Sequence, residues 1–406
     1  MKRLIPLCLC LLLAGCAGAP AAPATETTAC PETLPSAEAT ETTVPVILSP
    51  EEVILSRMTL RQKVGQLFMV RPDALDPDQS LNQMEDPNTP GVSQLDDGLA
   101  AALKEYPVGG FVQFSRNIRD PQQLLSFNTQ LSQSMEIPPF LAVDEEGGAV
   151  ARLASHPAFQ LPRYQSAGAV GSSGNSQDAL EMGRTIGTYL KDYGFHMDFA
   201  PVADVNTNPQ NPVIGTRSFS SDPVLAADCA QAMAQGLRES GILPVFKHFP
   251  GHGDTRTDSH TGGADSYKNM DQLESCELLP FRSATAQDCI MVGHIGMPEV
   301  TGDHTPATLS YAITTGILRN HLDFQGLIIT DSLSMGAITQ MAEPGEAAVQ
   351  AFQAGADILL MPQSLPQAFG GILEALESGE ISQQRLDSRV LRILRFKIDS
   401  GILIPS

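Results

Sequence analysis

The chain of 406 residues has few basic side chains: it carries 25 Lys and Arg against 46 Asp and Glu, for a formal net charge of −21. A surface this acidic repels nucleic acid and anionic lipid headgroups. We therefore expect neither a nucleic-acid partner nor electrostatic docking on a membrane surface.

Cysteine and glycine motifs are also missing. The seven cysteines form no CxxC pair and no Cys/His ligand spacing, so we expect neither a metal site nor a disulfide framework. The sequence leaves open whether Cys229, Cys276 or Cys289 pair. No Gly-rich phosphate loop follows an expected strand, and no Gly-x-Ser-x-Gly elbow is present, so nucleotide binding lacks support and we expect no cofactor.

A long apolar run is missing at the N-terminus, where residues 4–13 are too few to span a bilayer. Lys2 and Arg3 precede this run, and Leu13-Ala14-Gly15-Cys16 ends it. The arrangement resembles a bacterial lipoprotein signal, which implies that residues 1–15 are removed and that the Cys16 sulfur is lipidated. An ordinary secretory signal cut elsewhere is the alternative, and it too would export the protein.

Residues 16–50 consist mostly of Thr, Ala, Pro and Glu with almost no large apolar groups. Such a segment cannot bury enough surface to offset its ordering entropy, so we expect a disordered tether. Residues 51–406 are then expected to form one catalytic domain. The lipid would hold it on the outer face of the cytoplasmic membrane, or in the periplasm or outer membrane of a two-membrane envelope. Loss of the signal would change the formal charge from −21 to −23.

Short apolar runs rich in β-branched and aromatic residues recur along the body of the chain and alternate with helical patterns. Eight such runs predict strands, at Gly65–Val70, Gly110–Phe114, Phe140–Asp144, His196–Pro201, Leu243–His248, Cys289–His294, Gly326–Asp331 and Asp357–Met361. Helices are predicted at Pro223–Ser240, Asp271–Ala286, Ser310–His321, Glu346–Ala354 and Ser382–Ser400. This alternation predicts an α/β fold with a single (β/α)8 TIM barrel, and a doubly wound open sheet is the alternative.

Polar residues support the barrel, because several share one position at or just past the C-terminal end of an expected strand. They are Asp144, Asp204, Lys247, His248, His294 and Asp331. Active sites of barrel enzymes lie at this end of the strands. The shared position predicts an active site there.

The densest polar stretch is Lys247-His248-Phe249-Pro250-Gly251-His252-Gly253-Asp254, followed by Asp258-Ser259-His260. Charged and titratable groups at this density are costly inside a fold, and active-site loops are built this way. Metal-assisted hydrolysis remains an alternative, since Asp254, Asp258, His248, His252, His260 and His294 could supply ligands. Their spacing matches no defined metal motif.

The residues fit the needs of a retaining glycosidase, in which a carboxylate attacks the anomeric carbon and an acid protonates the leaving oxygen. Asp331 is the leading candidate for the nucleophile, because it ends a strand on a rigid barrel. Asp258 and His260 stand two residues apart, so the carboxylate can orient the imidazole and favour its protonated form. Ser259 lies between them, and its side chain should point away from both.

Four motifs make the chain similar to a known family: VDEEGGAVARL, IGTRSF, KHFPGHGDTRTDSH and GLIITDSLSMGAI. They resemble those of family-three glycoside hydrolases, in the β-N-acetylglucosaminidase (NagZ-type) branch, over about residues 55–396. The resemblance implies Asp331 as nucleophile, His260 as proton donor and Asp258 as its partner. It also implies sugar contacts from Asp144, Arg152, Arg217, Lys247 and His248.

Two positions depart from the family pattern. Ala149 stands where the family usually carries an arginine, and Thr261-Gly262-Gly263-Ala264-Asp265 replaces the usual leucine-proline continuation. The second departure puts in doubt how the catalytic loop closes.

We therefore expect an exported, lipid-anchored, exo-acting retaining β-N-acetylglucosaminidase. Its carbohydrate substrate would be terminal β-linked GlcNAc in peptidoglycan-derived muropeptides or other amino sugars. Alternatives are a β-glucosidase or β-xylosidase, a GlcNAc phosphorylase of the same fold, and a non-catalytic sugar-binding lipoprotein. The sequence does not predict the oligomeric state.

Overall fold

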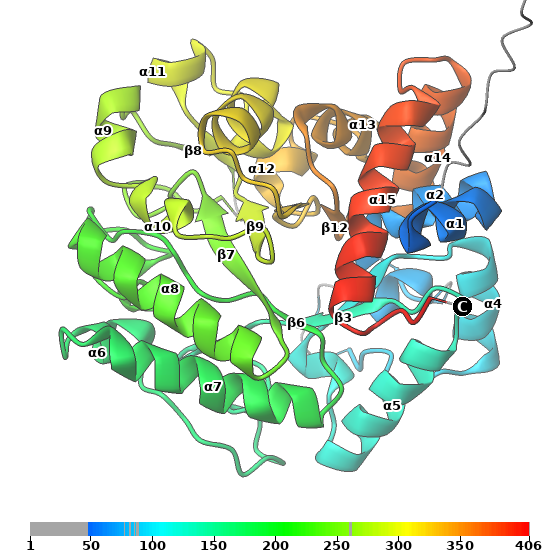
Figure 1. The fold of residues 1–406 in the computed structure, drawn as a ribbon, viewed down its shortest axis with the longest axis horizontal. Helices are drawn as coiled ribbons and strands as arrows, with labels where there is room; N and C mark the ends of the chain where they lie inside the picture. The colour runs from blue at the N-terminus through cyan, green and yellow to red at the C-terminus, as the bar shows by residue number, and fades with distance from the viewer. Residues whose placement is uncertain are drawn as a thin grey trace, which may run out of the picture. The chain divides into compact units, whose positions relative to one another are not determined.

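A ring of parallel strands forms the centre of the fold (Figure 1). The computed structural model describes residues 48–405 except 77, 81–82, 85, 87–88 and 260–261. In that part of the chain, eight strands run in the order β11-β9-β7-β6-β3-β2-β1-β12. A parallel bridge between Ile329 and Ile358 joins the two ends of this order. The fold is therefore a (β/α)8 barrel, and the open-sheet alternative is wrong.

Each of the eight predicted runs corresponds to one strand of the ring, and only β7 extends beyond its run, by one residue. The strands are β1 (Phe68–Val70), β2 (Gly110–Gln113), β3 (Phe140–Val143), β6 (Met197–Asp198), β7 (Leu243–Phe249), β9 (Cys289–Val292), β11 (Leu327–Thr330) and β12 (Leu359–Leu360). Every residue of β2, β3, β9 and β11 is buried, as expected for parallel strands covered on both faces.

Cys229, Cys276 and Cys289 are free thiols.

Helices cover the outside of the ring. The longer ones are α1 (Pro50–Arg57), α2 (Leu60–Gln66), α4 (Asp97–Glu105), α5 (Pro121–Gln133), α7 (Ser176–Asp192), α8 (Pro223–Glu239), η5 (Ala312–His321, a π-helix), α13 (Pro344–Ala354), α14 (Leu365–Glu377) and α15 (Gln383–Asp399). Most begin where a polar cap or proline predicts it: Asp222 caps α8 before Pro223, and Ser382 caps α15. α7 and α8 pack side by side (Figure 1).

One predicted helix is wrong as a continuous element. Asp271–Ala286 is broken into α9 (Met270–Ser275) and α10 (Leu279–Arg282), because Cys276 leaves helical geometry with φ −140° and ψ −81°. Pro280 lacks an amide hydrogen and occupies the first turn of the second helix. Between the two helices, the buried Glu277 forms an ion pair with Lys268. This contact favours the interruption of the helix at Cys276.

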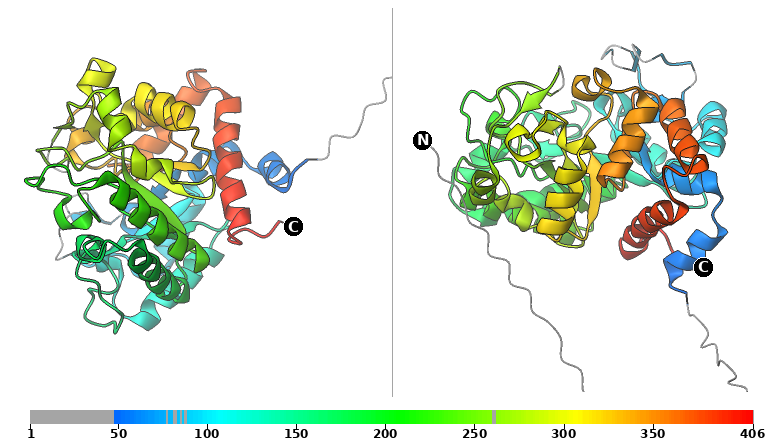
Figure 2. Two further views of the ribbon diagram at one scale, coloured as in Figure 1. Left: turned by 60° about the vertical axis from the view of Figure 1, so that its left-hand side comes forward. Right: turned by 90° about the horizontal axis from the view of Figure 1, so that it is seen from above.

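The two ends of the described chain meet on one side of the barrel. α15 lies beside α1 and α2 in both views of Figure 2. Arg395 of α15 donates to Glu51 of α1 at 2.8 Å, and Lys397 donates to Gln66 of α2 at 2.7 Å. These contacts hold the last helix against the start of the barrel.

Several short elements lie at the rim formed by the C-terminal ends of the strands. They are the hairpin β4 (Glu145–Gly147) and β5 (Val150–Ala151), the parallel pair β8 (Ala264–Asp265) and β10 (Ile295–Gly296), and α6 (Ala167–Gly171), α11 (Pro298–Thr301) and α12 (Gly336–Thr339). Short helical turns are η1 (Pro72–Leu75), η2 (Ser115–Asn117), η3 (Gly215–Arg217) and η4 (Ala307–Leu309).

The expected signal (1–15), Cys16 and nearly all of the expected tether lie outside the described residues. Among the residues that are described, no helix is both long and apolar enough to cross a bilayer.

Candidate active site

The sequence correctly places the polar residues at one end of the barrel. Asp144 directly follows β3, Lys247 and His248 lie near the end of β7, and Asp331 directly follows β11. His294 lies two residues past β9. Because all these strands are parallel, their C-terminal ends meet at the same rim.

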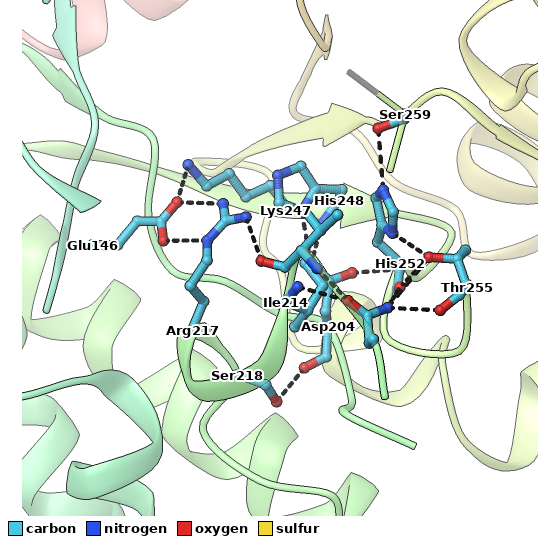
Figure 3. Close-up of polar contacts among 12 residues, drawn as sticks. Glu146, Asp204, Ile214, Arg217, Ser218, Lys247, His248, His252, Thr255 and Ser259 are labelled. Carbon is cyan, nitrogen blue, oxygen red and sulfur yellow. Dashed lines mark hydrogen bonds and ion pairs between the residues drawn. The ribbon is translucent and has the colours of Figure 1, made fainter. Parts of the chain in front are cut away.

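One cluster at this rim joins two carboxylates to three cations. Lys247 Nζ donates to Asp144 Oδ1 at 2.7 Å and lies 2.6 Å from Glu146 Oε1. Arg217 donates two hydrogen bonds to Glu146, from Nε to Oε2 at 2.8 Å and from Nη2 to Oε1 at 2.7 Å (Figure 3). Arg152 reaches Asp144 Oδ2 at 3.4 Å. The structure thus brings together four of the five predicted sugar contacts.

Glu146 is the member that the sequence prediction missed. It lies two residues after Asp144 in an extended segment, so the two side chains share one face. Glu145 between them faces the other way and accepts from the amides of Leu153 and Ala154 at 2.8 Å each. In an extended segment, side chains point alternately to opposite faces. This alternation along VDEEGG could have predicted that Glu146 shares a face with Asp144.

Electrostatics keep this cluster ionised despite its burial. Burial alone would raise the pKa of Glu146, but Lys247 and Arg217 outweigh it and lower that pKa to about 2. Lys247 and Arg152 likewise lower the pKa of Asp144 against the effect of burial. Burial would lower the pKa of Lys247, yet Asp144 and Glu146 raise it. The cluster therefore presents fixed charges, suited to hydrogen bonds with sugar hydroxyls.

A second group surrounds Asp204, in the segment after β6. Its Oδ2 lies 2.7 Å from His248 Nδ1, and its Oδ1 accepts from the His252 amide at 2.6 Å. Burial would raise the pKa of Asp204, but His248 outweighs it and lowers that pKa. Asp204 therefore orients the ring of His248 through its Nδ1 atom. His248 is the fifth predicted sugar contact.

The loop after β7 is held by its own short contacts (Figure 3). His252 Nδ1 lies 2.6 Å from Thr255 Oγ1, and Nε2 lies 3.1 Å from Ser259 Oγ. Gly253 packs so closely that a Cβ there would lie 1.9 Å from the Val205 carbonyl oxygen, which is why glycine is needed. Burial and His248 lower the pKa of His252, which favours the neutral form of its ring. Both ring nitrogens contact hydroxyls of the loop.

Asp331 is half-buried and lies in a bend directly after β11. Its amide donates to the Val292 carbonyl of β9 at 2.8 Å, and its Oδ1 accepts from the Ser332 amide at 2.7 Å. The buried His294 lies with Nε2 2.7 Å from the Ser332 carbonyl oxygen and Nδ1 2.8 Å from Thr308 Oγ1. These contacts fix the backbone on both sides of the carboxylate.

Two further predictions concern the loop and a metal. Asp258 lies half-buried on the loop, whereas His260 lies outside the described residues. Within the described part of the chain, no three His, Cys, Asp or Glu side chains gather as metal ligands would. Of the two departures noted above, Ala149 is exposed in the turn of the β4–β5 hairpin, and Ala264–Asp265 form β8, which pairs with β10 just after His294.

Residues 59–396 match the model of the glycosyl hydrolase family 3 N-terminal domain. The chain belongs to glycosyl hydrolase family 3. The family 3 match includes all eight strands of the barrel and the loop after β7.

Named relatives agree with this family. The chain is 34% identical to β-hexosaminidase A of Pseudoalteromonas piscicida over 326 residues, which cover 74% of this chain and 54% of that protein. It is 36% identical to β-hexosaminidase LpqI of Mycobacterium tuberculosis over 310 residues, 73% of this chain and 77% of that protein. The chain thus spans little more than half of the first relative.

Solved family 3 structures share the fold. A glycoside hydrolase family 3 β-N-acetylglucosaminidase from Paenibacillus sp. superposes with a TM-score of 0.76 at 35% identity, over 85% of this chain and 63% of that one. M. tuberculosis LpqI superposes with a TM-score of 0.72 at 32% identity, over 86% and 96%.

Proposed function

We propose that the chain is an exo-acting retaining β-N-acetylglucosaminidase with Asp331 as its nucleophile. The observation that carries this proposal is the setting of Asp331. Asp331 directly follows β11, and its Oδ1 accepts from the Ser332 amide at 2.7 Å. The backbone amide holds one oxygen of this carboxylate in place, and a positioned carboxylate is what attack on an anomeric carbon requires. The names of the relatives and of the Paenibacillus structure support the choice of sugar.

The reaction would proceed in two steps. Asp331 attacks the anomeric carbon of a terminal β-linked GlcNAc, while His260, oriented by Asp258, protonates the leaving oxygen. A covalent glycosyl-enzyme forms on Asp331. His260 then takes a proton from water, which attacks the same carbon and releases GlcNAc with retained configuration.

The charged cluster would bind the terminal sugar. Asp144 can accept from hydroxyls, and Lys247, Arg152 and Arg217 can donate to them. His248, the residue after Lys247 on β7, adds a donor or acceptor. Because Glu146 is bonded to both Lys247 and Arg217, these two cations are held before any sugar arrives, which lowers the cost of ordering them.

We further propose that the substrates are GlcNAc-bearing fragments such as peptidoglycan-derived muropeptides, and that the protein is exported and anchored by a lipid on Cys16. The anchoring rests on Leu13-Ala14-Gly15-Cys16 and its upstream Lys2 and Arg3. The choice of substrate rests on the family and on this proposed location.

A panel of chromogenic β-glycosides, assayed with and without phosphate, tests the activity. We expect release from the β-GlcNAc substrate, little from β-glucoside or β-xyloside, and free GlcNAc as product even when phosphate is present. Asp331→Ala should lower kcat by at least about a thousandfold, while the exposed control Asp228→Ala should not. Preference for a glucoside, a sugar phosphate product, or an Asp331→Ala variant that keeps a tenth of the rate would each contradict the proposal.

The leaving group tests the acid/base role. A nitrophenolate leaves with little protonation, whereas a sugar alkoxide needs much. His260→Ala should therefore cost about a hundredfold or more extra in kcat/KM on a GlcNAc disaccharide, compared with an activated aryl glycoside. Asp258→Ala should follow the same pattern more weakly. Equal losses on both substrates would move the general acid to another residue.

A further inference from the structure

Ser259 stands between the two residues proposed as the acid/base pair, and it is held from two sides. Its hydroxyl lies 3.1 Å from His252 Nε2, and its carbonyl accepts from the Ala337 amide at 3.3 Å. The residue is 1% exposed, although the nearby Arg256 and Thr257 are exposed. Ser259 is thus a buried residue that contacts the barrel next to an exposed part of the loop.

The first anchor, His252, is itself immobilised. Its amide donates to Asp204 Oδ1 at 2.6 Å, its Nδ1 lies 2.6 Å from Thr255 Oγ1, and its side chain is buried. The same Asp204 carboxylate lies 2.7 Å from His248 Nδ1. The ring of His252 therefore presents Nε2 to Ser259 from a position that the barrel fixes.

The second anchor belongs to the segment of the proposed nucleophile. Ala337 lies in α12 (Gly336–Thr339), six residues after Asp331. Two contacts hold the turn between Asp331 and Ala337. His294 Nε2 lies within hydrogen-bond distance of the Ser332 carbonyl oxygen, and the Leu333 amide donates to the Leu360 carbonyl of β12 at 2.9 Å. Ser259 thus joins the loop after β7 to the segment after β11.

We propose that Ser259, held by His252, is a positioning residue that sets its neighbour Asp258 against the Asp331 segment, and that it supports in this way the proton donation proposed for His260. This inference rests on the proposed function. A displacement of a catalytic group by about 1 Å can cost about a hundredfold in rate, and Ser259 ties the exposed Arg256 and Thr257 to the buried His252. Loss of the hydroxyl should therefore weaken proton donation more than sugar binding.

A series of aryl β-N-acetylglucosaminides whose phenols differ in pKa tests this role. The slope of log kcat/KM against phenol pKa reports how well the leaving oxygen is protonated during glycosylation. Ser259→Ala should make the slope steeper, with a loss of about tenfold for the least acidic phenol, of the size that one hydrogen bond supplies. The most acidic phenol should lose no more than about twofold.

Ser266→Ala is the matched control. Ser266 is also a buried hydroxyl beyond the same loop, and it donates to Asp254 Oδ2 at 3.1 Å. We expect this variant to keep the wild-type slope. A shared steepening in both variants would mean that any loosening of the loop has this effect, and it would overturn the specific role of Ser259.

Variants at the other end of the contact separate positioning from folding. His252→Ala should reproduce the slope of Ser259→Ala, and the double variant should be no steeper than the worse single one. His252→Gln can place an amide near the Nε2 position and should restore part of the wild-type slope. Additive effects, or a loss that is equal for all phenols while the thermal midpoint falls, would show that Ser259 serves only stability.

Failure of this inference is distinguishable from failure of the proposed function. If wild-type protein releases no GlcNAc from any member of the series, the function is wrong. If wild type is active and Ser259→Ala has an unchanged slope, only the positioning role is wrong.

Discussion

At the scale of single residues, Glu146 shows how a buried charge can organise a binding site. Its side chain is 2% exposed and contacts both Lys247 and Arg217 at 2.6–2.8 Å. Removal of one member of a buried ion-pair network leaves the others desolvated and uncompensated. The two cations would then turn toward Asp144 or solvent rather than toward a sugar.

Glu146→Gln should therefore lower both stability and activity. We expect a loss of about 3 kcal/mol in the free energy of unfolding at neutral pH, and a fall of about a hundredfold in kcat/KM. Urea unfolding and steady-state kinetics measure these effects. Glu181→Gln, which breaks the exposed pair with Arg184 on α7, should cost less than about 1 kcal/mol and no activity.

The pH dependence of this variant has a defined sign. The pKa of Glu146 is about 2 in the fold against an ordinary 4.5, so its ion pairs stabilise the fold above pH 4.5. That stabilisation is lost as the pH falls from 4.5 toward 2. Glu146→Gln should flatten this acid limb of the unfolding curve, and an unchanged limb would contradict the ionised cluster.

The sequence predicts where this site lies but not how its residues pair. Asp144, Lys247 and Asp331 could be placed at one rim because parallel strands end together. The contacts from Glu146 to Arg217 and from Asp204 to His248 join residues separated by 71 and 44 positions. Such pairs depend on the twist of the barrel and the paths of its loops, which local patterns do not encode.

At the scale of elements, periodicity locates strands and helices well and fails where a side chain overrides it. The break at Cys276 follows Glu277 turning inward to Lys268. On α15, the apolar face Leu386, Val390 and Ile393 continues at the next spacing with Lys397, which is fully buried. Its ammonium donates to Gln66 and lies 5.0 Å from the centre of the Phe140 ring.

Lys397 should make stability depend on pH. Burial lowers its pKa to about 7 from an ordinary 10.5. Between these values the unfolded chain binds more protons than the folded one, so the free energy of unfolding should rise with pH, by up to ~1.4 kcal/mol per pH unit. Urea unfolding at pH 7, 8 and 9 measures the slope.

The matched pair of variants is Lys397→Met and Lys104→Met, the second being exposed on α4. Lys397→Met should remove the rise in stability between pH 7 and 9, whereas Lys104→Met should keep it. If both variants retain the wild-type slope, the side chain of Lys397 is charged throughout this pH range, and another interaction offsets the cost of burying that charge.

At the scale of the whole molecule, a formal charge of −21 does not favour binding to an anionic membrane, so the proposed anchoring depends on the lipid on Cys16. Cys16→Ser should release the protein from the membrane fraction and leave activity on soluble substrates unchanged. Cys30→Ser, in the expected tether, is the matched control and should remain with membranes. A Cys16→Ser protein that still sediments with membranes would mean that another segment anchors it.

The most direct test of the central proposal is the mass of the protein during turnover. Wild type quenched in acid while it hydrolyses an activated β-GlcNAc glycoside should carry one GlcNAc adduct, and peptide mapping should place it on the peptide that contains Asp331. His260→Ala should accumulate more of this adduct, because it lacks the base for deglycosylation, and Asp331→Ala should show none. An adduct on another residue, or a product released first as the α anomer without any adduct, would contradict Asp331 as the nucleophile of a retaining enzyme.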